Sequence, residues 1–175
     1  MRPALIATAL LSGGLIAGAL FLEHVLGVLP CKLCLVQRYP HYAIFGLSLA
    51  GLAAGAARLP SRRLADMRAA LLFAAGIAFL YTGGYGVFHT GVERGWWPGP
   101  ADCSGSALPE STAALGTLLA QGEEFVRCDA PPWTVLGLSL ANYNTLISLP
   151  AAVFVLFVAA AWLKTRIYVP REQHG

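Results

Sequence analysis

Residues 4–22 are ALIATALLSGGLIAGALFL, an uninterrupted run of 19 residues without a charged side chain. About 20 apolar residues are needed to span the hydrocarbon core of a bilayer as an α-helix. Three further uncharged runs follow, at residues 39–57, 69–92 and 130–163. The runs therefore predict a chain that crosses a membrane several times.

The last of these runs is too long for a single crossing. It opens with two prolines and Trp133, and it contains Asn142 and Asn144. Polar and aromatic residues of this kind suit the interface better than the hydrocarbon. We therefore place the fourth span at about residues 145–163.

The composition agrees with a membrane protein. Hydrophobic residues make up 57% of the 175 residues and charged residues only 12%, whereas a soluble domain has about 25% charged residues. We expect an all-α membrane protein, a four-transmembrane-helix bundle that forms one domain over residues 1–175. The spans are placed at about 4–22, 39–57, 69–89 and 145–163, and a long loop at about 90–144.

The basic residues predict the orientation. Seven of the nine acidic residues lie on one side of the predicted membrane. Eight of the 12 basic residues lie on the other side, namely Arg2, Arg58, Arg62, Arg63, Arg68, Lys164, Arg166 and Arg171. By the positive-inside tendency the basic side is cytoplasmic, together with both termini, as in a multi-pass protein of a bacterial inner membrane. A cleaved signal peptide is an alternative for the first run, although its apolar core would typically be only about 7–15 residues.

All four cysteines lie on the predicted outer side. Cys31 and Cys34 separate the first two spans, and Cys103 and Cys128 lie in the long loop. The periplasm is a compartment in which disulfides form and persist. The predicted topology and the cysteine positions therefore support each other.

Cys31-Lys32-Leu33-Cys34 directly precedes the second span. If a helix begins near Cys34, the positive end of its dipole and its free N–H groups favour a thiolate. A CxxC disulfide closes a ring too small to constrain much of the unfolded chain, which favours a reactive pair over a structural disulfide. Zinc is a further alternative, but it needs four ligands and the sequence has no second CxxC, so we expect no metal.

Arg38 follows Cys34 by four residues, so both side chains project from one face of a helix. This places a permanent positive charge near the sulfur or near a reduced oxygen species. An arginine at a helix end can equally extend to the lipid headgroups. Both interpretations of Arg38 are compatible with its position.

Cys103 and Cys128 enclose a loop with a weakly amphipathic segment at residues 110–125. This segment predicts a short helix on the membrane surface, or a solvated loop helix. A disulfide between the two cysteines would close a flexible loop and contribute about 3–4 kcal/mol. Alternatively, a mobile loop would let a partner thiolate attack one sulfur and carry the freed thiolate to the CxxC pair.

Together these features resemble the DsbB family of disulfide bond formation proteins over nearly the whole chain. The resemblance lies in the four spans, in Pro30 with the CxxC motif and the following Gln37-Arg38, and in the second cysteine pair. It extends to the Gly-Val-Glu-Arg-Gly-Trp-Trp stretch at 91–97 and to the segment 133–140 after Cys128.

The resemblance implies the chemistry. A thiolate of a periplasmic DsbA-like thiol oxidase would attack Cys103, and the freed Cys128 would attack Cys31. Cys34 would then donate electrons to ubiquinone or menaquinone.

The resemblance also implies that Arg38 stabilises the developing charge on the quinone, with His89 nearby. His89 lies at the outer end of the third span and could hydrogen-bond or protonate a quinone oxygen. An interfacial histidine without this role fits its position equally well.

The expected partners are this thiol oxidase, the membrane lipid and the quinone pool, and no nucleic acid. Two alternatives are a four-helix quinone oxidoreductase of the vitamin-K-epoxide-reductase-like type and a non-enzymatic membrane protein with two structural disulfides. The first would carry its CxxC near a later span. The second would show no quinone-dependent absorbance change.

Overall fold

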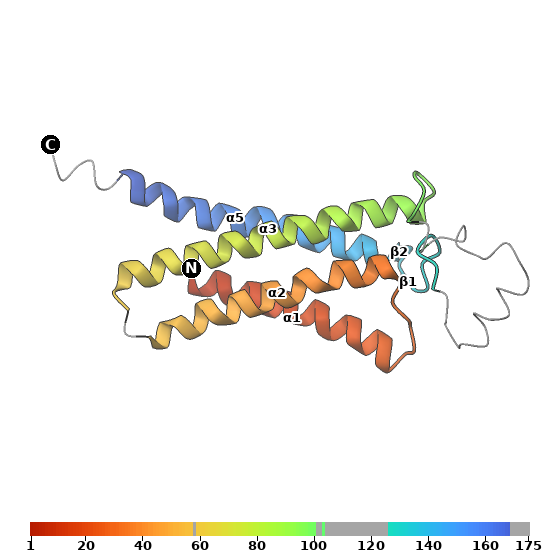
Figure 1. The fold of residues 1–175 in the computed structure, drawn as a ribbon, viewed down its shortest axis with the longest axis horizontal. Helices are drawn as coiled ribbons and strands as arrows, with labels where there is room; N and C mark the ends of the chain where they lie inside the picture. The colour runs from red at the N-terminus through yellow and green to blue at the C-terminus, as the bar shows by residue number, and fades with distance from the viewer. Residues whose placement is uncertain (58, 101–102, 104–125, 169–175) are drawn as a thin grey trace, which may run out of the picture.

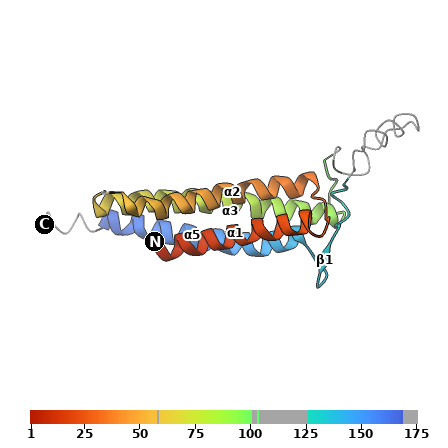
Figure 2. The ribbon, with the colours of Figure 1, turned by 90° about the horizontal axis from the view of Figure 1, so that it is seen from below.

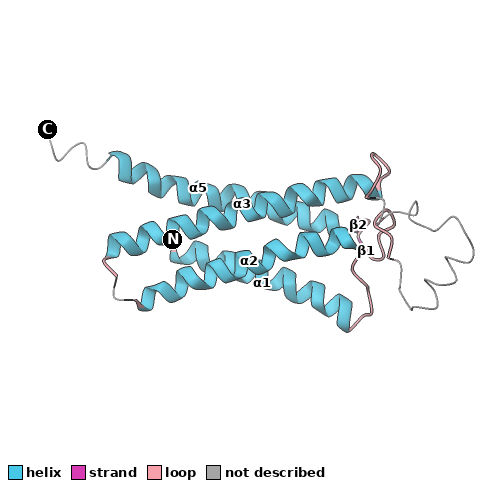
Figure 3. Cartoon of the chain, in the orientation of Figure 1, coloured by secondary structure: helices cyan, strands magenta, loops and turns pink. Residues whose placement is uncertain are grey.

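The computed structural model describes residues 1–57, 59–100, 103 and 126–168. In these ranges four long helices lie side by side along one axis (Figures 1 and 2). They are α1 (Arg2–His24), α2 (Lys32–Ala53), α3 (Ser61–Glu93) and α5 (Leu140–Tyr168), and a short 3-10 helix, η1 (Ala54–Ala56), follows α2. The predicted helical architecture is therefore confirmed for the described residues (Figure 3). The predicted surface helix at 110–125 lies outside them.

Among the described helices, α1, α3 and α5 are long and apolar enough to cross a membrane. Helix α2 packs with them in the bundle, contacting both α1 and α3. Its first half carries Lys32, Gln37, Arg38 and His41, which lower its mean hydropathy. Three membrane-capable helices are thus present, and the crossing by α2 stays a prediction.

The helices extend beyond the predicted spans. Helix α3 continues to Glu93 and α5 begins at Leu140, so residues 90–93 and 140–144 are helical and the predicted loop at 90–144 is too long at both ends. Helix α3 ends where Gly95 adopts a φ of +67°, a left-handed conformation that glycine tolerates. A backbone stop of this kind, rather than the loss of hydrophobicity, ends the helix.

A small hairpin precedes α5 and was not predicted. Strand β1 (Thr134–Val135) pairs antiparallel with β2 (Leu138–Ser139). Leu136 and Gly137 connect them with φ values of 51° and 76°, the positive pair that a type I′ turn requires. Leucine is uncommon at such a position, so the residues of this turn do not signal a hairpin.

Helices α3 and α5 make the most extensive contact in the bundle, and glycines of α3 allow their close approach. A Cβ at Gly76 would lie 2.7 Å from the Leu156 side chain, and a Cβ at Gly83 would lie 2.7 Å from that of Leu149. Small residues commonly allow helices to pack closely in membranes. The same packing brings residues 140–144 of α5 against the outer half of α3.

We expect Gly83→Leu to lower the free energy of unfolding by about 1–3 kcal/mol, the usual cost of overpacking. The matched control is Gly84→Leu, because a Cβ at Gly84 meets nothing within 4 Å. Thermal or SDS unfolding of both variants in detergent measures the difference. Equal stability of the two variants would contradict the packing described here.

Candidate functional site

The four cysteines meet at one end of the bundle. Cys31, Cys103 and Cys128 are buried in one cluster with Leu33 and Val92, and Cys34 packs against it. The Sγ atoms of Cys31, Cys103 and Cys128 all lie within 4.8 Å of one another. Two cysteine pairs that are far apart in the chain are therefore adjacent in space.

The two loop cysteines are bonded to each other, whereas the two cysteines of the CxxC motif are not. Cys103 and Cys128 form a disulfide with their Cα atoms 5.3 Å apart, and the backbone N–H of Cys128 donates to the carbonyl of Cys103. Cys31 and Cys34 are free thiols with their Sγ atoms 3.0 Å apart. The loop disulfide thus lies directly against a dithiol.

The CxxC pair lies at the N-terminus of α2, as predicted. Cys31 is the N-cap residue, and its sulfur accepts a hydrogen bond from the backbone N–H of Cys34 at 3.3 Å. A hydrogen bond from the Cys34 side chain is the main cause that lowers the pKa of Cys31 to about 5, against the opposing effect of burial and with help from a hydrogen bond of His89. We therefore expect Cys31 to be a thiolate at neutral pH.

We expect the alkylation rate of Cys31 in the reduced protein to change less than about twofold between pH 6 and 8, because a thiol of pKa about 5 is already ionised there. An ordinary thiol, with a pKa of about 8.5, would gain about tenfold for each of these pH units. Iodoacetamide labelling with peptide mass spectrometry measures the rate at Cys31 alone.

Cys34→Ala serves as the comparison for this profile. It removes the largest cause of the lowered pKa, so the rate should acquire a rise between pH 6 and 8. A wild-type profile that already rises tenfold per unit in this range would contradict the assignment.

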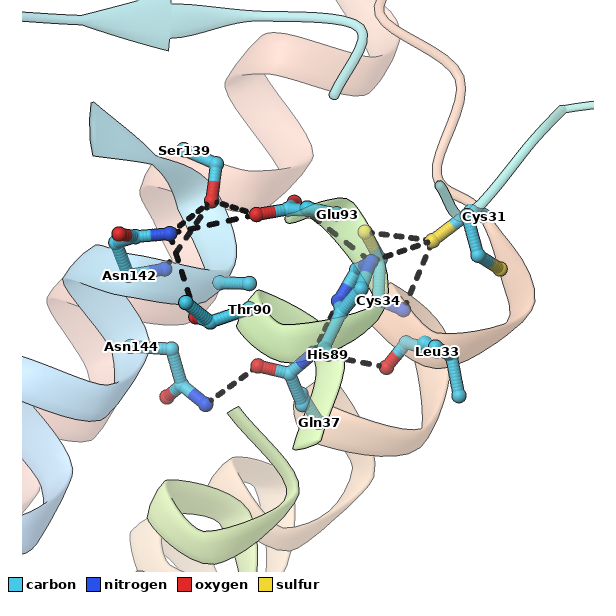
Figure 4. A network of polar contacts seen from close by, with 12 residues as sticks. Cys31, Leu33, Cys34, Gln37, His89, Thr90, Glu93, Ser139, Asn142 and Asn144 are labelled. Atoms are coloured by element: carbon cyan, nitrogen blue, oxygen red, sulfur yellow. Dashed lines mark hydrogen bonds and ion pairs between the residues drawn. The ribbon is translucent and has the colours of Figure 1, made fainter. Parts of the chain in front are cut away.

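His89 lies beside Cys31, enclosed by polar side chains (Figure 4). Its Nε2 atom is 3.6 Å from Cys31 Sγ and 3.7 Å from Glu93 Oε1, and its Nδ1 atom is 2.7 Å from Gln37 Nε2. His89 is not among the residues that line the cavity described below. The structure therefore places it next to the sulfur, and its predicted contact with a quinone stays a prediction.

Hydrogen bonds from Ser139 and Asn142 hold the Glu93 side chain in place. Its Oε2 atom accepts hydrogen bonds from Ser139 Oγ and from Asn142 Nδ2, and Asn142 also donates to Thr90 Oγ1 (Figure 4). These bonds join α3 to the beginning of α5. They keep a buried carboxylate close to His89 and the CxxC pair.

Sequence reasoning missed Glu93, Asn142 and Asn144 as site residues, and it included Gln37 only as part of a motif. In the sequence analysis, Asn142 and Asn144 only indicated that the fourth span begins after them. A signal was present, since polar residues at membrane-helix positions are functional candidates by default. Which of them would meet could not be predicted, because they come from three different helices.

A cavity of about 220 Å³ opens beside Cys34. Its walls are mainly aliphatic residues of α1 and of the segment after it, and its polar lining includes Gln37, Arg38, His41 and Asn144. Apolar walls with a few convergent polar groups are typical of small-molecule sites. Cys34 is thus shared between the sulfur cluster and the cavity.

Arg38 is paired with a carboxylate at this cavity. Its Nη1 atom donates to Glu23 Oε2 at 2.5 Å, and the two side chains are 12% and 22% exposed. This ion pair joins α2 to the end of α1. It holds the guanidinium at the cavity wall. Arg38 and Cys34 project from the same face of α2, and the ion pair with Glu23 of α1 holds the Arg38 side chain in this position.

The metal alternative finds only part of a ligand set here. Cys31, Cys34 and His89 bring three donor atoms within 4.8 Å of one another, whereas structural zinc uses four ligands. The nearby sulfurs of Cys103 and Cys128 are bonded to each other. The arrangement is better suited to exchange between a disulfide and a dithiol.

The fold and the site together define a helical membrane protein with two adjacent cysteine pairs, suited to thiol–disulfide exchange. The model of the family described as disulfide bond formation protein DsbB matches residues 1–158. The chain belongs to the DsbB family of disulfide bond formation proteins.

Curated relatives agree with this assignment. The chain is 32% identical over 161 residues to disulfide bond formation protein B of Herminiimonas arsenicoxydans, a match that covers 90% of this chain and 94% of that protein. It is 34% identical over 155 residues to the protein of that name from Stutzerimonas stutzeri, covering 82% and 85%. A third, from Aromatoleum aromaticum, is 31% identical over 153 residues, covering 84% and 85%. Membership of this family decides against the vitamin-K-epoxide-reductase-like alternative.

Proposed function

We propose that this protein oxidises the dithiol of a periplasmic DsbA-like thiol oxidase and passes the electrons to a membrane quinone. The observation that carries the proposal is the position of the CxxC pair. Cys31 lies within 4.8 Å of both sulfurs of the Cys103–Cys128 disulfide, and Cys34 lines the cavity. A continuous path for exchange therefore leads from the loop to the cavity.

The first half of the cycle moves the disulfide onto the partner. A partner thiolate attacks Cys103, and Cys128 leaves as a thiolate. Cys128 then attacks Cys31 of an oxidised Cys31–Cys34 pair, so that Cys34 leaves as a thiolate beside the cavity. The second thiol of the partner displaces Cys103, and the partner departs with a new disulfide.

The second half of the cycle restores the loop disulfide. The Cys103 thiolate attacks Cys128 in the Cys31–Cys128 bond, which reforms the loop disulfide and releases Cys31. Cys31 and Cys34 now hold the two electrons of the partner dithiol, with one of its protons on the Cys34 thiol and the other released. The low pKa of Cys31 supports this step, because a stable thiolate is a good leaving group.

The cavity residues fit a quinone headgroup. A quinone bound there, ubiquinone or menaquinone, accepts two electrons and two protons, which balances the oxidation of one dithiol. The aliphatic walls exclude water and suit an apolar ring. Arg38 supplies a fixed positive charge for an oxygen that becomes negative, and Cys34 presents its sulfur on the same wall.

The proposal requires the cysteines to lie in the periplasm. We place all four helices across a bacterial inner membrane, with both termini in the cytoplasm. The basic residues in α1, in the connection between α2 and α3 and toward the C-terminus favour this orientation. The start of α1, the α2–α3 connection and the end of α5 lie toward the end of the bundle opposite to β1 and β2 (Figure 1).

Trapping the partner tests the proposal. In Cys128→Ser the unpaired Cys103 thiolate attacks the disulfide of the oxidised partner, whose second sulfur leaves, and no Cys128 thiol is present to resolve the product, so we expect a mixed disulfide between Cys103 and a periplasmic CxxC protein. Non-reducing gels and mass spectrometry identify the adduct, and reduction with dithiothreitol should separate the two proteins. Cys103→Ser is the control and should trap much less. An absence of any periplasmic thiol protein on Cys103 would refute the proposed partner.

A further inference from the structure

The buried side chain of Gln37 has its amide orientation fixed by two helices. Its Nε2 atom lies 3.1 Å from the carbonyl oxygen of Leu33, and its Oε1 atom lies 2.8 Å from Asn144 Nδ2 (Figure 4). A backbone carbonyl can only accept a hydrogen bond, so the NH₂ end of Gln37 must face Leu33. The reversed amide would place two acceptors together in a site where Gln37 is 5% exposed.

Asn144 is oriented independently. Its Nδ2 atom lies 3.0 Å from the backbone carbonyl of Thr82, and its Oδ1 atom accepts from the Ser148 hydroxyl at 2.9 Å. Asn144 must therefore present an N–H to Gln37 Oε1. Both ends of the Gln37 amide are thus determined without reference to His89.

The orientation of Gln37 dictates the hydrogen position on His89. Because Gln37 Nε2 is a donor and lies 2.7 Å from His89 Nδ1, Nδ1 must be the unprotonated acceptor. The imidazole proton is then on Nε2, which faces Cys31 Sγ at 3.6 Å and Glu93 Oε1 at 3.7 Å. A doubly protonated ring would set two N–H donors against each other where the His89 side chain is only 3% exposed.

We propose that Gln37 is a positioning residue that holds His89 as the neutral Nε2–H tautomer, so that His89 acts on Cys31 only as a hydrogen-bond donor. This inference rests on the proposed function, because it assigns a task in that cycle. When Cys103 displaces Cys31 from Cys128, the Nε2–H stabilises the departing Cys31 thiolate. His89 neither gives up nor takes a proton in this step.

Among the described residues, the other ionisable or charged groups that face this site are Cys34 on α2 and Glu93 on α3, with Arg94 beside Glu93. The loop contributes the Cys103–Cys128 disulfide, which does not titrate while it is intact. The effect of His89 on Cys31 must therefore be distinguished from the effects of these groups. A spectroscopic observation of His89 itself achieves this.

The test is ¹⁵N NMR of histidine-labelled full-length protein in detergent, with the His89 signals assigned by their loss in His89→Asn. We expect one pyrrole-like nitrogen, Nε2, and one pyridine-like nitrogen, Nδ1, at neutral pH. The opposite tautomer, or a ring with two pyrrole-like nitrogens, would overturn the proposal.

Two variants of Gln37 keep the test decisive. Gln37→Glu replaces the donor by an acceptor, so Nδ1 should become protonated and its signal should shift to a pyrrole-like position. The alkylation profile of Cys31 should then gain a second ionisation between pH 5 and 8. Gln37→Met removes the donor without adding charge, and both tautomers should appear. A His89 spectrum that stays unchanged in both variants would show that Gln37 is merely structural.

Thr82→Val is the matched control. The Thr82 hydroxyl donates to the backbone carbonyl of Gln37 at 2.8 Å and accepts from Asn144 Nδ2 at 3.1 Å, but it does not contact the Gln37 side chain. Asn144 keeps its bond to the backbone carbonyl of Thr82 in the variant, so Thr82→Val should retain the wild-type His89 spectrum. The measurements need neither quinone nor partner. Failure of this inference is therefore distinguishable from failure of the proposed function, which the mixed-disulfide trap tests separately.

Discussion

Cys34→Ser should reduce quinone reduction by dithiothreitol to the rate seen without protein, a loss on the order of 10³-fold or more. Cys34 is the sulfur on the cavity wall, and a serine hydroxyl can neither form the Cys31–Cys34 disulfide nor donate its electrons. The decrease in absorbance of a soluble quinone, followed with purified protein in detergent, measures the rate. Cys31→Ser should have the same effect, because the disulfide requires both sulfurs.

The matched variants are Cys103→Ser and Cys128→Ser. Each destroys the loop disulfide but leaves the CxxC pair, which a small dithiol can reduce directly. We expect both to retain turnover with dithiothreitol and to lose turnover with a protein dithiol. Undiminished turnover by Cys34→Ser would refute the assignment of the CxxC pair as the centre linked to the quinone.

Arg38→Met should lower kcat for quinone reduction by about 10²–10³-fold, the usual effect of removing one preorganised group that stabilises developing charge. The guanidinium lines the cavity one helical turn beyond Cys34, and methionine keeps most of its length without its charge. Steady-state rates against quinone concentration separate kcat from KM. Arg38→Lys should be intermediate, because it keeps the charge and loses the planar guanidinium.

Glu23→Gln is the control for the ion pair. It leaves the positive charge of Arg38 in place and removes only the charge of its partner at the end of α1. We expect a much smaller loss than in Arg38→Met. If Arg38→Met turned over within twofold of the wild type, Arg38 would serve only to anchor the two helices at the membrane surface.

Much of the fold is determined locally. Uncharged runs of 19 residues or more predicted where the helices lie, because a helix in a bilayer must satisfy its backbone within its own segment. The CxxC motif directly precedes the second uncharged run, which is compatible with a helix start near Cys34, and capping also depends on neighbours in the chain. The helix ends were less predictable, because Gly95 and the hairpin at 134–139 depend on single backbone conformations.

The amino-acid sequence by itself determined the helical class, the position of the CxxC pair at a helix start and the placement of Arg38 near Cys34. Only the tertiary structure decided that Cys31 contacts the loop disulfide, that Glu23 pairs with Arg38, and that Gln37 orients His89. The physical reason is the range of the interactions. Helix formation, capping and the spacing of residues on one face are set within a few positions. The site is assembled by packing among α1, α2, α3 and α5, where glycines such as Gly83 allow helices distant in the chain to approach.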